Sequence, residues 1–311
     1  MTTVSLPAEP VVAGPGDSPA QHLRAKLDTE LRALTSREPG TRAGKDPEDL
    51  HQMRVATRRM RSVLKLGRQL LGPEAEQVRA ELGWLGAALG EVRDYDVLIG
   101  HLREVVADFE VADQAAGRRL VSEFVRQRGQ AKRRLNRALS SERYAALLST
   151  AARLTQRPDI EPGQGEAEDG EARTVLVGSL RKPHRRLVKA AAALPEDPPD
   201  DDLHALRIHS KRLRYAAELA RPAAGRKQAK RLRGLVKAAK RLQTVLGDHQ
   251  DAVVAVSRMR DLLGTATGAD AHVGFVAGRI VERELAKRAE ARRRWRGLVA
   301  DIDAAARAVL P

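Results

Sequence analysis

The stretch LHQMRVATRRMRSVLKL at residues 50–66 recurs as LHALRIHSKRLRYAAEL at residues 203–219. Both copies keep a leucine followed by a histidine, which is His51 in the first and His204 in the second. Both also keep an arginine or lysine at four later positions. An internal repeat determines the architecture of a protein, because each copy forms an equivalent structural unit. The sequence therefore predicts two homologous halves.

Helical periodicity divides each copy into a basic face and an apolar face, because residues three or four apart lie on one side of a helix. The basic face of the first copy consists of His51, Arg54, Arg58, Arg61 and Lys65. The basic face of the second copy consists of His204, Arg207, Lys211 and Arg214. The neighbouring face of the first copy is predicted to be buried and consists of Leu50, Met53, Thr57, Met60 and Leu64.

Two further pairs of segments repeat in the same order. LGEVRDYDVLI at 89–99 matches LGDHQDAVVAV at 246–256, and AKRRLNRAL at 131–139 matches ARRRWRGLV at 291–299. Three matches in one order indicate two halves of about four helices each. Two such halves are expected to pair about a pseudo-twofold axis, so that equivalent helices face each other.

Composition favours an all-α protein with an anionic partner. The chain has 311 residues, of which 42% are apolar and 3% aromatic, which suits helices packed through aliphatic side chains. Lysine and arginine number 56 against 41 acidic residues, for a net charge of +15. Such an excess favours an anionic partner without identifying it. Cysteine is absent, which excludes disulfides, thiol nucleophiles and thiolate metal sites.

The sequence predicts no secretory signal and no apolar run of the ~18 residues that a membrane span requires. We therefore expect a cytoplasmic protein without a membrane partner. Residues 1–19 are rich in proline, glycine and small side chains and are predicted to be a disordered tail. An N-terminal helical half is expected at 20–155, an acidic Gly/Pro linker at 156–172 and a C-terminal helical half at 173–309.

Helices are predicted within both halves, and Asp46-Pro47 is typical of a helix start because aspartate caps the first turn and proline suits its first position. The predicted helices span residues 20–36, 47–71, 73–110, 113–139, 142–154, 173–194, 202–220, 226–262 and 270–308.

These stretches resemble the CHAD family, the conserved histidine α-helical domain. The resemblance is carried by HQMRVATRRMRS at 51–62, LGEVRDYDV at 89–97, RQRGQAKRRLNRAL at 126–139, and the second copies at 204–215 and 246–253. It extends over residues 20–309 and implies two four-helix bundles with a basic groove or pore between them. The implied activity is non-catalytic binding of inorganic polyphosphate and targeting to polyphosphate granules. Members of the family often occur beside a CYTH-type triphosphatase domain, so CYTH-type enzymes are expected partners.

The resemblance implies that ligand is contacted by the basic faces of both copies: His51, Arg54, Arg58 and Arg61, with His204, Arg207, Lys211 and Arg214. It also places Arg93 in an Arg-Asp pair with Asp94. Gln250 stands where the second copy would have that arginine, so the two halves are expected to contribute unequally.

Other helical stripes of basic residues are candidates for the same cavity, and a solvated basic face is an equally open alternative for each of them. They are Arg126, Arg133 and Arg137; Lys182, Arg185 and Lys189; and Arg226, Lys230, Arg233, Lys237 and Lys240.

The roles of the histidines and acids stay open at this point. His51 and His204 either donate a hydrogen bond to phosphate or support a neighbouring helix, for example through Asp94 or Asp251; metal binding is the weakest alternative. The acids are interpreted as groups that orient the arginines. The sequence supplies no assembled nucleophile and base, so we predict no cofactor and no catalysis. Alternatives are a polyphosphatase or triphosphate hydrolase, or a basic protein that binds nucleic acid non-specifically.

Overall fold

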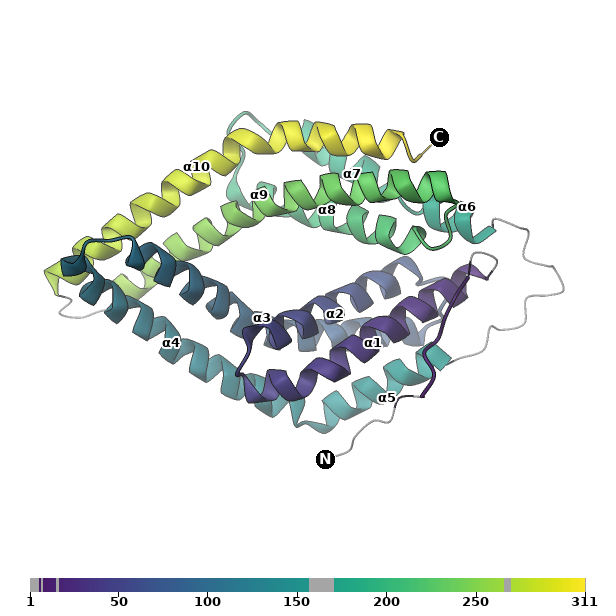
Figure 1. Cartoon of the computed structure of the whole chain (residues 1–311), viewed down its shortest axis with the longest axis horizontal. Helices are drawn as coiled ribbons and strands as arrows, with labels where there is room; N and C mark the ends of the chain where they lie inside the picture. Colours follow the sequence, from purple (N-terminus) through teal and green to yellow (C-terminus); the bar gives the residue numbers. More distant parts are fainter. Residues whose placement is uncertain (1–5, 7, 15–16, 157–170, 266–269, 311) are drawn as a thin grey trace.

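The fold was analysed in a computed structural model that describes residues 6, 8–14, 17–156, 171–265 and 270–310 (Figure 1). The described residues form helices joined by short turns and contain no strand, which confirms the all-α prediction. The helices are α1 (Pro19–Ala43), α2 (Pro47–Leu66), α3 (Glu74–Ala107), α4 (Val111–Leu139), α5 (Glu142–Gln156), α6 (Glu171–Gly178), α7 (Arg181–Ala192), α8 (Asp200–Ala220), α9 (Arg226–Thr265) and α10 (Ala271–Arg307).

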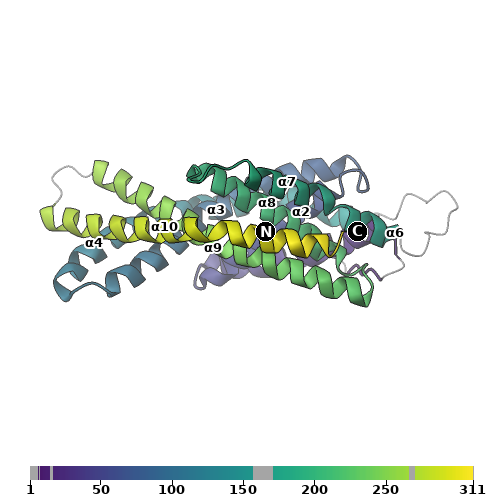
Figure 2. The same ribbon diagram turned by 90° about the horizontal axis from the view of Figure 1, so that it is seen from above.

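The helices are arranged in two groups that follow the chain order. Helices α1–α5 lie together on one side of the molecule and α6–α10 on the other, as Figure 1 shows. The repeated segments fall on α2, α3 and α4 in the first group and on α8, α9 and α10 in the second. Seen from above, the molecule is elongated, with the beginnings of α4 and α10 at the same end (Figure 2).

Helix α2 begins and ends as its residues dictate. Asp46 accepts a hydrogen bond from the backbone N–H of Glu48 at 2.8 Å and Pro47 occupies the first turn, so the predicted cap is confirmed. The predicted apolar face is buried: Leu50, Met53, Thr57, Met60 and Leu64 are each at most 3% exposed. Burial of this face is what orients α2.

The helix boundaries differ from the prediction in three places. Helix α1 continues past Pro39 to Ala43, where Gly44 adopts a left-handed φ of 69° and donates to the Gly40 carbonyl. Helix α2 stops at Leu66 instead of residue 71. The predicted helix over 173–194 is two helices, α6 and α7. Pro183 has no N–H and suits the first turn of a helix but not its interior, so a new helix begins at Arg181.

The two groups share one core and are joined at both ends. Buried side chains from Leu23 to Val309 form a single apolar cluster. At one end α2 contacts α8, and α1 contacts α6 and α8. At the other end α4 contacts α10. There Arg279 pairs with Asp113, and Arg283 lies 2.5 Å from Asp108.

Part of the predicted tail and most of the predicted linker lie outside the described residues. The described part of residues 1–19 contacts α1: the Val11 N–H donates to Asp28 at 3.0 Å, and Arg32 donates to the Glu9 carbonyl at 2.8 Å. None of the described helices combines the length and the apolar character that a membrane-spanning helix needs.

The buried face of α2 yields a prediction. Met53→Asp places a carboxylate without a partner in the core, because Met53 is 0% exposed. We expect the free energy of unfolding to fall by more than about 4 kcal/mol, with loss of helical circular dichroism. The control is Arg61→Asp on the exposed face of the same helix, where a surface change of about 0.5 kcal/mol or less is expected. Equal urea midpoints for both variants would reverse the assignment of the two faces.

Candidate functional site

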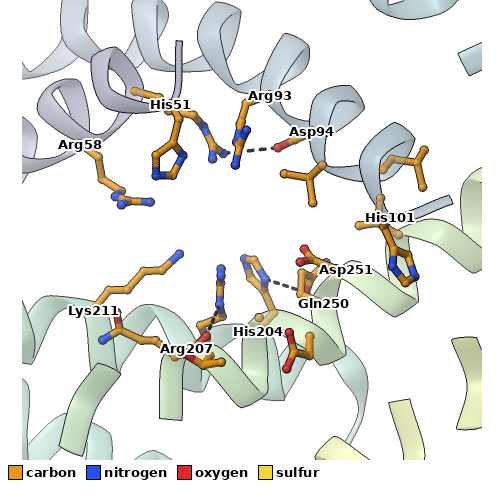
Figure 3. Close-up of a pocket in the computed structure, with 18 of the residues that line it drawn as sticks. His51, Arg58, Arg93, Asp94, His101, His204, Arg207, Lys211, Gln250 and Asp251 are labelled. Atoms are coloured by element: carbon orange, nitrogen blue, oxygen red, sulfur yellow. Dashed lines mark hydrogen bonds and ion pairs between the residues drawn. The ribbon is translucent and has the colours of Figure 1, made fainter. Parts of the chain in front are cut away.

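A cavity of about 640 Å³ lies between the two groups of helices, lined by residues of α2, α3, α8 and α9. Side chains from the two groups point toward one another across it (Figure 3). The cavity brings together nine of the residues selected from the sequence: His51, Arg54, Arg58, Arg93, His204, Arg207, Lys211, Arg214 and Lys240. The repeated histidine helices therefore face a shared space.

The position of each basic face follows from the burial of the apolar face beside it. In α8, Leu203, Leu206 and Leu213 are at most 1% exposed, and their counterparts in α2 are at most 3% exposed. Because α2 and α8 contact each other, the basic residues that border the buried stripes emerge into the same cavity. Long arginine and lysine stems pack along apolar surface while their charged heads reach open space.

Two glycines make room for equivalent arginines. Arg54 lies over Gly90 of α3, and Arg207 lies over Gly247 of α9. A Cβ atom at Gly247 would sit 3.1 Å from Nη2 of Arg207, closer than an ordinary van der Waals contact. These glycines therefore allow each guanidinium to lie directly on the neighbouring helix.

Two arginines from different halves lie near the same aromatic ring. The Arg214 guanidinium lies 4.7 Å from the Tyr215 ring centroid, and the Arg58 guanidinium lies 5.8 Å from the same centroid. Each Nε atom is buried without a hydrogen-bond partner among the described residues. The π face of tyrosine attracts both cations and so offsets part of their mutual repulsion.

Positive charge exceeds negative charge inside the cavity. Seven lysine and arginine side chains line it, against the carboxylates of Asp94, Asp248 and Asp251. Burial, followed by neighbouring arginines, lowers the pKa of Lys211 to about 7. Burial also lowers the pKa of Arg58 and of Arg207, and nearby cations add to both effects. The cavity therefore carries more positive charge than its three aspartates neutralise.

The two repeated histidines have different surroundings. His204 Nδ1 lies 2.7 Å from the Gln250 side-chain oxygen, so it supports a neighbouring helix through an amide and not through Asp251. His51 Nδ1 is buried and has no hydrogen-bond partner within the described part of the chain. Burial, with Arg93 as the next cause, lowers the pKa of His51. Among the described residues, no three histidine, aspartate or glutamate side chains are grouped as a metal site would require.

The counterparts Arg93 and Gln250 both line the cavity, so the replacement makes its two sides unequal. Asp94 lies 3.5 Å from Arg54, as expected of an acid that orients an arginine. Arg207 instead donates from Nε to the Gln243 carbonyl at 3.4 Å.

The other predicted residues lie elsewhere. Lys65, Lys182 and Arg185 line a second pocket on the far side of α8. Arg126 is exposed and pairs with Glu123 at 2.5 Å. The cavity lining also does not include Arg61, Arg133, Lys189, Lys230, Arg233 and Lys237, which are all exposed.

Sequence reasoning missed His101, which lines the cavity from α3 and lies 2.5 Å from Glu284 of α10. It also missed Gln243 and Thr244 of α9. A helical stripe from Asp94 through Val97 to His101 was the available signal, because these residues follow the i, i+3, i+7 spacing of one face.

The profile of the CHAD domain matches residues 25–260. This chain belongs to the CHAD domain family. The structure of the CHAD domain from the plant Ricinus communis is similar, with a TM-score of 0.72 and 25% identity. That likeness covers 97% of this chain and 96% of the plant chain. PptA from Streptomyces chartreusis has the same fold, with a TM-score of 0.67 and 21% identity over 92% of this chain and 99% of its own.

Two proteins of Mycobacterium tuberculosis strains, the uncharacterized proteins MT2285 and Rv2226, are each 33% identical over 215 residues. The alignment covers 66% of this CHAD chain and 39% of each mycobacterial protein. The chain therefore spans well under half the length of these relatives.

The environment of Lys211 yields a prediction. Its pKa is about 7 in the folded CHAD domain against 10.5 in the unfolded chain, so between these values the unfolded state binds more protons. The penalty of burying the charged ammonium is therefore fully present below about pH 7 and is relieved as the pH rises from 7 toward 10.5. Lys211→Met should raise the free energy of unfolding by roughly 2 kcal/mol at pH 7 and by less at pH 9.5.

Urea denaturation at the two pH values measures the effect. Lys240→Met is the matched control, because Lys240 lines the same cavity but is exposed. A stabilisation by Lys211→Met that did not change with pH would show that folding does not lower the pKa of Lys211.

Proposed function

We propose that this CHAD domain binds inorganic polyphosphate, without catalysis, in the cavity between its two halves. The observation that supports the proposal is the convergence of cations from both repeats on one space. Seven lysine and arginine side chains meet there, and burial with mutual repulsion lowers the pKa of several of them. A bound polyanion would neutralise these cations and so relieve their mutual repulsion.

The chemistry of the lining matches a bare phosphate polymer. Polyphosphate carries roughly one negative charge per phosphate, and a helix presents one side chain per turn of about 5.4 Å. Arginine meets phosphate oxygens with two parallel N–H groups, and lysine adds a point charge. His51 lines the cavity as well, and its imidazole adds a polar group beside the arginines.

Two other functions fit the lining less well. Proteins that hold single-stranded nucleic acid stack bases on aromatic rings, and the described residues that line this cavity include no tryptophan, tyrosine or phenylalanine. A hydrolase would need a positioned nucleophile and base, whereas Asp94 is engaged by Arg54. We extend the proposal to a cytoplasmic protein that is targeted to polyphosphate granules and acts beside polyphosphate-metabolising partners such as CYTH-type enzymes.

Calorimetric titration with polyphosphates of increasing length tests the proposal. Affinity should rise with chain length and fall steeply with salt, because each neutralised phosphate releases counterions. Arg54→Ala and Arg207→Ala should each weaken binding by about 1–3 kcal/mol, because each removes a charge-assisted hydrogen bond from a partly desolvated site.

Arg133→Ala is the control for these variants, since it removes one exposed arginine outside the cavity. Equal loss of affinity in all three variants would show that binding depends only on the net charge of the protein. Displacement of polyphosphate by duplex DNA at equal phosphate concentration would favour the nucleic-acid alternative. Phosphate release with Mg²⁺ that Asp94→Ala abolishes would favour the hydrolase.

The glycine beneath Arg207 yields a separate prediction. Gly247→Ala should displace the guanidinium by a few tenths of an ångström and weaken polyphosphate binding several-fold. Gly234→Ala in the same helix is the control, because its added Cβ would meet nothing within 4 Å. Both variants should gain about 0.5–1 kcal/mol of helix stability. Unchanged affinity in Gly247→Ala would mean that the position of Arg207 is not important for binding.

A further inference from the structure

A second pocket, of about 570 Å³, lies where the end of α2, the turn between α6 and α7, and the outer side of α8 meet. It is strongly cationic, and the described residues that line it include no aspartate or glutamate. Its charged lining includes Lys65, Arg68, Lys182, Arg185, Arg186 and Arg212. The pocket is distinct from the cavity, because Arg212 lies on α8 away from the face that carries Arg207 and Lys211.

Comparison of the two repeats shows that the first half has a neutralising acid with no counterpart among the described residues that line this pocket. Arg59 of α2 is the counterpart of Arg212, and Arg59 lies 3.5 Å from Glu30, a carboxylate on α1 that is 3% exposed. Arg212 instead lines the pocket together with Arg186 and Lys65. Besides burial, both arginines lower the pKa of Lys65. Glu76 is close to Lys65, but it is held by Arg79.

Titration of the pocket groups agrees with this charge imbalance. Burial, followed by Arg212, lowers the pKa of Lys65. Burial, followed by Arg212 and Arg186, lowers the pKa of His209, which also lines the pocket. The cations of the pocket therefore hinder one another's protonation, and the described residues that line it supply no carboxylate to offset their charge.

Helix α7 adds positive potential at the same place. It starts at Arg181 with no side-chain cap and no acid in its first turn, and Lys182 occupies that turn. The N-terminus of a helix carries a partial positive charge, so acids are favoured there and lysine is not. Basic residues at this end are favourable when an anion lies against them, and phosphate is the anion that helix N-termini commonly hold.

We propose that this pocket is a second phosphate-binding site. It takes phosphate groups of an inorganic oligophosphate, either as a separate short chain or as part of a longer polymer that also occupies the cavity. The lysines and arginines of α2, α7 and α8 bind the phosphate oxygens, and the α7 N-terminus adds its dipole. The site stands independently of ligand binding in the cavity.

Calorimetry with tripolyphosphate and with a long polyphosphate tests the proposal on three double variants. Lys182→Gln/Arg186→Gln alters two exposed residues of the pocket, and Arg54→Gln/Arg207→Gln alters the cavity. Arg133→Gln/Arg137→Gln removes two exposed charges from α4 as the matched control. The pocket variant should bind one tripolyphosphate fewer than the control, or bind it at least tenfold more weakly. It should also melt higher than the control without ligand, because repulsion has been removed.

The long polymer distinguishes the two sources of phosphate. A parallel loss of affinity for it in the pocket variant means that one chain spans both sites, and an unchanged affinity means that the pocket takes separate short chains. Tripolyphosphate binding in the pocket variant equal to that of the control overturns the second site. An unaffected cavity variant overturns the proposed function of the cavity and leaves the second site standing.

Discussion

Repulsion among like charges is the constraint that the rest of this structure must satisfy. The apolar faces of α2 and α8 are buried in one core that includes both halves, and this burial brings their basic faces together. Two unit charges 4 Å apart repel by about 1 kcal/mol in water and by about 4 kcal/mol near a protein surface. The apolar core supplies the free energy that opposes this repulsion, so the cavity exists because the stripes beside it are buried.

The acids of the protein are distributed so that they join the halves without neutralising the cavity. Asp108 and Asp113 pair with arginines of α10 at the end of the molecule remote from the α2–α8 contact. Glu284 is 1% exposed and meets His101 across the two groups of helices. Asp28 and Glu30 are buried on α1 and engage basic residues of the first half. The pairs that Asp108, Asp113 and Glu284 make between the two halves fix the separation of the halves while the facing arginines keep their charge.

The sequence predicted the parts of the site that are both periodic and repeated. Helical periodicity identified the buried and basic faces of α2, and the second copy showed which charges of the cavity have counterparts in both halves. The pair Arg61 and Arg214 is the exception, because Arg61 is exposed whereas Arg214 lines the cavity. Helical periodicity without a repeat was insufficient to predict the cavity lining, because a basic stripe does not indicate which helix it faces. Lys240 reaches the cavity, whereas Lys230 and Lys237 from the same stripe do not. His101 has no histidine counterpart in the second copy, so the repeat did not indicate it. The break before α7 depended on Pro183, and a search for periodic apolar residues does not register a single proline.

The replacement of Arg93 by Gln250 in the second repeat makes the two sides of the cavity chemically different. The first half offers a guanidinium where the second offers an amide that lies 2.7 Å from His204. A cavity built from two identical separate subunits would change on both sides with every substitution. Because both repeats lie in one polypeptide, a single substitution changes one side alone, and the charge of each half can be set separately.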